Sequence, residues 1–168
     1  MKEIFKRRSI RKFKAQEVEP EKIEKLLRAA MQAPSAGNQQ PWEFIVVRQK
    51  ETLNKLSQVS PYSKPVAGSA VTFVLLANVG DLKIPTAWEQ DMGAAAENLL
   101  LEAVNLGLGG VWLGVATADA TVENVRRLFQ LPDDIRPFAL ISVGYPDGQE
   151  NVFVDRYKAV KVHDEKWR

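Results

Sequence analysis

Residues 33–47, APSAGNQQPWEFIVV, join the end of a helix to a strand through a loop of small polar residues. Pro34 disfavours α geometry in the residue before it, so a helix that arrives from the N-terminal side should end there. The aromatic and β-branched residues at 43–47 suit a buried strand. Ser35 and Gly37 are small enough for a ligand or another backbone to approach closely. The stretch is therefore either a binding loop beside a core strand or a structural turn.

Hydrophobic periodicity predicts a series of helices and strands around this loop. We expect helices over residues 3–8, from residue 19 to the loop, and over residues 51–59, 86–106 and 122–130, the last capped by Thr121. We expect strands over residues 43–47, 70–77, 111–115 and 138–143. The apolar run at 70–77 is nearly continuous, which is typical of a central strand covered on both faces.

The longest predicted helix has very little side-chain volume at its centre. Residues 93–96 read Gly-Ala-Ala-Ala, and small residues allow another backbone to lie close. Apolar residues occupy more than one face of this helix. It is therefore either the most deeply buried helix of a single chain or a contact between subunits.

Composition narrows the classes of protein to which the chain can belong. It has 168 residues, a net charge of +2, no cysteine and one histidine. Disulfides, thiol catalysis and thiolate metal sites are excluded, and His163 alone cannot form a multi-histidine metal site, so we expect no metal. No apolar run reaches the roughly 18 residues of a membrane helix, and residues 1–5 lack a secretory signal. We expect a single cytoplasmic domain over residues 1–168 that does not associate with membranes.

A basic cluster near the N-terminus, RRSIRKF at residues 7–13, surrounds a serine with arginines. Guanidinium groups offer several fixed donors, and a serine hydroxyl adds another, so the cluster suits a phosphate. The alternative is a solvated basic patch. A nucleic-acid arm is disfavoured, because the cluster is short, lacks interleaved aromatic residues and lies in a chain that is not otherwise basic.

Residues 106–115, LGLGGVWLGV, place glycines in a turn and within a short strand. Glycine inside a strand often marks the close approach of a ligand or another backbone. The pattern is not a dinucleotide fingerprint, because the glycines follow a helix and no GxGxxG motif precedes one. The sequence also contains no Walker motif.

In order and spacing, these blocks resemble the flavin-dependent nitroreductase family. RRSIRKF resembles its Arg-x-Ser-x-Arg/Lys opening, and APSAGNQQPWEF resembles its Pro-Ser-x-x-Asn-x-Gln-Pro-Trp loop. LGLGGVWLGV resembles its Gly-Leu-Gly-x-x-Trp segment, and LISVGYP resembles its late strand and Gly-Tyr-Pro turn. The resemblance covers essentially the whole chain.

The resemblance implies an α+β fold in which a mainly antiparallel central sheet is flanked by helices. It also implies an intertwined homodimer with FMN bound at the subunit interface. The C-terminal tail, about residues 150–168, would reach across to the partner subunit. The small-residue helix would then be a candidate for the dimer contact.

The resemblance also assigns candidate cofactor-binding residues. Arg7 and Ser9 match positions at the flavin phosphate or ribityl chain, Arg8 a ribityl contact, and Arg11 a cation near the pyrimidine edge of the ring. A second group matches a loop that reaches the flavin of the other subunit: Pro34, Ser35, Ala36 and Asn38. Leu113 and Gly114 match a segment near the reactive nitrogen, and Arg156 matches a late basic residue at the phosphate.

The implied activity is reduction of a small electron acceptor, such as a nitroaromatic or a quinone, by NADH or NADPH in a two-step cycle. The flavin supplies the chemistry, so we expect no catalytic side chain. The region from residue 58 to 88 is short, so Tyr62, Trp88 or Trp112 could line an open substrate pocket. The alternatives are dehalogenation or flavin breakdown on the same fold, flavin sensing or storage without turnover, and RNA binding through the basic cluster.

Overall fold

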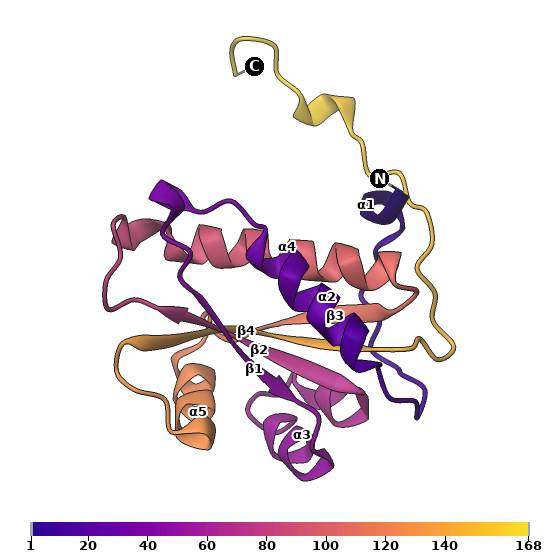
Figure 1. Cartoon of the computed structure of the whole chain (residues 1–168). Helices are drawn as coiled ribbons and strands as arrows, with labels where there is room; N and C mark the ends of the chain where they lie inside the picture. The colour runs from indigo at the N-terminus through magenta and orange to yellow at the C-terminus, as the bar shows by residue number, and fades with distance from the viewer. Residues whose placement is uncertain (1, 168) are drawn as a thin grey trace.

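A four-stranded sheet forms the centre of the structure, a computed structural model that describes residues 2–167 (Figure 1). Its strands are β1 (Trp42–Val47), β2 (Val71–Asn78), β3 (Gly109–Gly114) and β4 (Ile135–Gly144). They lie in the order β1-β2-β4-β3, and each neighbouring pair is antiparallel. The expected α+β fold with an antiparallel sheet is confirmed.

Helices cover both faces of this sheet. In Figure 1, α2 (Pro20–Met31) and α4 (Trp88–Asn105) lie above it, and α3 (Lys50–Leu56) and α5 (Asp119–Phe129) lie below it. A short helix, α1 (Lys2–Lys6), lies near the C-terminal end of α4. Single 3₁₀ turns complete the chain: η1 (Ala36–Asn38), η2 (Lys64–Gly68), η3 (Pro85–Ala87) and η4 (Ala159–Lys161).

Strand β2 separates two hydrophobic layers. Phe73 and Leu75 belong to the layer between the sheet and helices α2 and α4. Val74 and Leu76 belong to the layer between the sheet and helices α3 and α5. Because successive side chains of a strand point to opposite faces, burial on both sides requires a continuous apolar run. The predicted central strand at residues 70–77 is confirmed.

The small-residue helix, α4, is buried along the face that meets the sheet. Met92, Ala95, Ala96 and Leu99 have no exposed surface, and a Cβ added to Gly93 would lie 3.9 Å from the ring of Trp112. The small side chains thus allow α4 to lie close to the sheet. Its expected deep burial is confirmed, while its role in a subunit contact stays a prediction.

Several predicted helix ends differ from the structure: α3 ends at Leu56 rather than residue 59, and two further ends have a clear cause. The Thr121 cap is wrong: Ala118 is the extended N-cap of α5, and its carbonyl accepts the N–H groups of Thr121 and Val122 at 2.9 and 3.0 Å. Asp119 complements the positive helix end, so the helix begins earlier. The N-terminal helix ends at Lys6 rather than residue 8, because the next residues extend along β3.

The N-terminal segment is fastened to the outer edge of β3. Ser9 pairs in parallel with Gly110, and the Ile10 N–H donates to the Gly110 carbonyl at 3.0 Å. Gly109 makes this approach possible, since a Cβ there would lie 2.5 Å from Cγ1 of Ile10. Gly109 therefore leaves room for the side chain of Ile10, which lets the N-terminal segment lie along the strand. The predicted close approach of a ligand at Gly114 stays a prediction.

The C-terminal residues extend away from the two layers (Figure 1). Large apolar side chains along this tail are exposed: Val152, Phe153, Val154, Tyr157, Val160, Val162 and Trp167. At its start, Phe153 stacks on Phe5 with ring centroids 5.6 Å apart. His163 lies in this tail, as expected, with its ring 4.2 Å from that of Trp167. None of the helices described in residues 2–167 has the length and apolar character to cross a bilayer.

Candidate functional site

Three arginines gather where α1, the N-terminal segment and the tail meet. Arg7 Nε donates to Glu97 Oε1 of α4 at 3.1 Å. The Arg8 guanidinium donates to the carbonyls of Arg7 and Phe5, the latter at 2.8 Å. Burial, and then the positive charges of Arg156 and Arg7, hold the pKa of Arg8 below its ordinary value. The three charges are therefore close enough to repel one another.

One donor in this cluster has no acceptor. Arg8 Nε is buried and makes no hydrogen bond to any residue that the structure describes. An unsatisfied buried donor of a charged group is costly, and several cations held together are costly as well. An anion placed beside Arg8 would offset the cost of the neighbouring positive charges.

Two side chains after β4 fix the backbone of the basic segment, residues 7–12. Gln149 Oε1 accepts the N–H groups of Arg11 and Lys12 at 2.7 and 3.0 Å. Asn151 accepts the Arg8 N–H at 3.1 Å and donates to the Leu108 carbonyl at 2.9 Å. Ser9 and the Arg11 side chain remain exposed. Sequence reasoning missed both amides, although Asn and Gln beside a glycine turn are suited to binding backbone groups.

The outer edge of β3 runs onward from the basic segment. Apart from the Ser9 bridge, no strand within residues 2–167 pairs with it, so alternate N–H groups can face a ligand. Leu113 points into the layer under α5, which leaves its backbone, with that of the exposed Gly114, at the edge. Trp112 lies on the opposite face, with its ring 5.5 Å from that of Phe138.

The 34–38 loop lies at the other end of α4 from the basic segment. Asp91, buried in the first turn of α4, accepts the Ala36 N–H at 2.9 Å, and Ser35 Oγ accepts the Gln40 N–H at 3.0 Å. Among residues 2–167, no hydrogen bond joins the loop to the arginines or to β3. Within one chain, the structure thus brings the basic segment and the strand residues Leu113 and Gly114 together. The third predicted group, the 34–38 loop, makes no hydrogen bond to either of them among residues 2–167.

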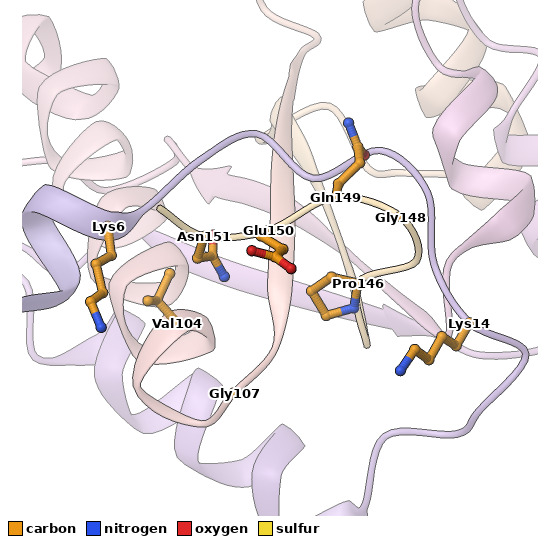
Figure 2. Close-up of a pocket in the computed structure, with 9 residues that line it drawn as sticks. All are labelled: Lys6, Lys14, Val104, Gly107, Pro146, Gly148, Gln149, Glu150 and Asn151. Carbon is orange, nitrogen blue, oxygen red and sulfur yellow. The ribbon is translucent and has the colours of Figure 1, made fainter. Parts of the chain in front are cut away.

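A pocket of about 700 Å³ lies behind the basic segment (Figure 2). Lys6 and Lys14 stand at its two ends, with Glu150 and Asn151 between them. None of the predicted cofactor-binding residues lines it. The predicted site is therefore an open edge of the chain rather than an enclosed cavity.

Comparisons with known proteins show which family the chain belongs to. A sequence profile described as the nitroreductase family matches residues 4–67 and 62–145. The chain belongs to the nitroreductase family. A protein of Archaeoglobus fulgidus, provisionally named NADH dehydrogenase/NAD(P)H nitroreductase, is 41% identical over 170 residues, which cover 99% of this chain and 98% of that protein.

Solved structures share the nitroreductase fold along nearly the whole chain. A provisionally named NADH oxidase from Clostridium acetobutylicum is 55% identical with a TM-score of 0.97, covering 98% of this chain and 99% of that one. An FMN-dependent nitroreductase from Clostridium difficile R20291 is 34% identical with a TM-score of 0.92, covering 99% and 100%. The predicted family is confirmed.

The site of this nitroreductase is suited to binding and orientation rather than to acid–base or metal catalysis. It offers guanidinium donors, a serine hydroxyl and strand N–H groups. Within residues 2–167, no group of three His, Cys, Asp or Glu side chains could hold a metal ion. The family is one of oxidoreductases, which rely on a bound cofactor for electron transfer.

Proposed function

We propose that this nitroreductase binds FMN and uses NADH or NADPH to reduce small electron acceptors. The observation that carries the proposal is that Arg7 and Arg8 lead directly into Ser9, which pairs with Gly110 at the free edge of β3. The names of the relatives support it, because one is described as FMN-dependent and another as an NAD(P)H nitroreductase.

The residues present fit a flavin phosphate. A phosphate dianion would offset the repulsion that Arg156 and Arg7 exert on the Arg8 guanidinium. The exposed Ser9 hydroxyl lies in the same segment and can donate to the phosphate or to the ribityl chain. A solvated basic patch would not need a buried, unsatisfied guanidinium nitrogen.

The remaining predicted residues would orient the ring. Arg11, exposed on the same segment, would place a positive charge at the pyrimidine edge, where it would favour the reduced anionic ring. The backbone at Leu113 and Gly114 would lie along the ring. When bound, FMN supplies the redox chemistry, taking hydride from NAD(P)H and then passing electrons to an acceptor such as a nitroaromatic or quinone. No side chain is assigned a catalytic role, and protons come from solvent.

We also propose a homodimer with FMN at the subunit interface. Among residues 2–167, no hydrogen bond joins the 34–38 loop to the arginines of its own chain, which supports contact with the FMN of the partner. The exposed apolar side chains of the tail, including Trp167 at 87% exposure, support docking of this segment on a second copy. The nature of the acceptor and the cytoplasmic location stay predictions.

An absorbance spectrum of the purified protein, followed by heat release and identification of the cofactor, tests the proposal. About one FMN per chain, together with sustained NAD(P)H oxidation when an acceptor is added, is the expected result. FMN binding without turnover would instead indicate sensing or storage. A colourless protein that takes up no added FMN would contradict the proposal, and strong salt-dependent RNA binding would then favour the nucleic-acid alternative.

A further inference from the structure

The 35–40 loop holds a backbone conformation that its own residues do not favour. Gly37, Asn38 and Gln40 have φ angles of 58°, 53° and 47°, all in the left-handed region. Glycine and asparagine enter this region more readily than other residues, whereas Gln40 does so at a cost. Contacts within the loop, such as that from the Gln40 N–H to Ser35 Oγ at 3.0 Å, and contacts from outside it hold this conformation.

A polar clamp formed by Asp91 and Gln39 supplies these contacts. Asp91 is 4% exposed; its Oδ1 accepts the Ala36 N–H at 2.9 Å and its Oδ2 accepts Gln39 Nε2 at 2.6 Å. Gln39 Oε1 in turn accepts the Ile84 N–H at 3.0 Å. The clamp thus joins the loop to α4 and to the segment before η3.

Each oxygen of the Asp91 carboxylate is bonded to the loop. Both oxygens of Asp91 accept hydrogen bonds from donors of the loop, and the charge lies in the first turn of α4, where the helix dipole stabilises an anion. Lys83 adds a donor from the outer side, binding the Gly37 carbonyl at 3.1 Å. Burying a carboxylate costs free energy, and an ordinary turn can be closed without one.

We propose that Asp91 is a positioning residue that holds the 35–40 loop in the conformation needed to bind FMN, and that it acts through Gln39. The inference rests on the proposed function. Three of the predicted flavin contacts, Ser35, Ala36 and Asn38, lie on the clamped loop. Asp91 itself is buried, and both of its carboxylate oxygens are bonded to the loop.

The decisive variant is Asp91→Asn, which keeps the size of the side chain but replaces one acceptor with a donor. The oxygen of the new carboxamide can still accept the Ala36 N–H. The nitrogen of the same carboxamide then faces Nε2 of Gln39, and two donors cannot bond each other. Gln39 must then turn, which costs the bond from Ile84. We expect faster hydrogen exchange at the amides of Ala36 and Ile84, and FMN binding weakened by roughly tenfold.

A second substitution should reverse the effect. In the Asp91→Asn, Gln39→Glu double variant, one oxygen of the introduced carboxylate accepts the new amide donor and the other accepts the Ile84 N–H. Only the longer bond from Gln39 Nε2 to the Ile84 carbonyl, at 3.3 Å, is not replaced. We expect FMN affinity and slow amide exchange to be largely restored. Glu89→Gln, an exposed change in the same helical turn, is the matched control.

FMN fluorescence titration and amide exchange of the full chain separate the outcomes. Unchanged FMN affinity in Asp91→Asn, or a double variant no better than the single one, overturns the inference. If Asp91→Asn does not fold, Gln39→Ala replaces it because Gln39 is partly exposed, and unchanged affinity there overturns the inference too. If the parent protein binds no FMN, the proposed function fails, and unaltered exchange in Asp91→Asn would separately refute the clamp.

Discussion

At the scale of single residues, Arg7 is the clearest test of the proposed phosphate site. In Arg7→Ala, the phosphate loses a charge-assisted hydrogen bond worth about 1.5–3 kcal/mol, so FMN binding should weaken by at least tenfold. Glu97 would also be left without its partner and would add negative charge beside the site. Titration of the apoprotein with FMN, followed by flavin fluorescence, measures the change.

Arg127→Ala is the matched control for this test. Arg127 is an exposed arginine on α5 that is paired with Glu123 at 3.5 Å, on the opposite side of the sheet from α4. It should leave FMN affinity unaltered. Equal affinities in the two variants would remove Arg7 from the binding site.

Gly109 is a second position where one residue has a large effect. Gly109→Ala would place a methyl group 2.5 Å from Cγ1 of Ile10, so the basic segment must move off β3. We expect a loss of about 1–3 kcal/mol in the free energy of unfolding, measured by urea denaturation. Gly68→Ala is the control, because a Cβ there meets nothing within 4 Å, and it should change stability little. An unchanged free energy of unfolding in Gly109→Ala would show that Ile10 can move aside at little cost.

At the scale of elements, the start of α2 is tied to the turn after β4 by three side chains. Lys22 Nζ donates to the Tyr145 hydroxyl at 2.6 Å, and this hydroxyl donates to Glu19 Oε1 at 2.8 Å. The Lys14 N–H donates to the Tyr145 carbonyl at 2.8 Å. The contacts fix both the helix and the chain that continues from the basic segment.

These contacts predict a pH dependence of stability. A hydrogen bond from its own backbone N–H, and then that from Tyr145, lower the pKa of Glu19. A lowered folded-state pKa stabilises the protein above the ordinary Glu value of about 4.3, and this contribution is lost as the pH falls through the folded pKa. Between neutral and acidic pH, the free energy of unfolding should therefore fall less in Tyr145→Phe than in the parent protein.

Urea denaturation at neutral and acidic pH measures this difference. The pKa of Lys22 is raised, first by the bond to Tyr145, so its contribution is lost only at strongly alkaline pH and does not alter the acid range. Tyr62→Phe, at an exposed tyrosine, is the control. If the free energy of unfolding falls equally in Tyr145→Phe and in the parent protein on acidification, the tyrosine is ruled out as a cause of the lowered Glu19 pKa.

Elements with a strong hydrophobic period could be predicted from the sequence. The apolar run that forms β2 and the small-residue centre of α4 were both identified, because burial on two faces and close packing leave local signals. The end of α1 was not, since it depends on pairing between Ser9 and a strand about a hundred residues later. The clamp of Asp91 and Gln39 also could not be predicted, because an acidic residue early in a helix is ordinarily explained by the helix dipole.

At the scale of the whole molecule, the tail tests the proposed homodimer. Light scattering should give twice the chain mass of 18.8 kDa. Val160→Asp places a charge on a tail side chain that is 82% exposed within one chain, and it should weaken the dimer if the tail docks on a partner.

Tyr62→Asp is the control for this substitution, because Tyr62 is 81% exposed but lies outside the tail. In a monomer the two substitutions should be equally harmless. A parent protein with the mass of one chain, or two variants that dimerise alike, would contradict the proposed role of the tail.

The candidate site could be predicted only as a set of motifs. Arginines around a serine and small residues in a loop indicated a phosphate cluster and a binding loop, but the assignment of single residues to the flavin came from the family resemblance and stays a prediction. The relative placement of the motifs was not accessible, since it depends on how far apart the fold holds the two ends of α4. That separation, rather than any local pattern, leaves the 34–38 loop away from the arginines of its own chain.

The attachment of the basic segment to β3 and the turn after β4 has a consequence for synthesis of the protein. Arg7 and Ser9 leave the ribosome well before Gly110, Gln149 and Asn151, which hold this segment. The helices made between them can form while the segment still has no partner. The basic segment is therefore ordered late although it is made early relative to its partners, and a polypeptide released before residue 151 lacks the contacts that would hold it.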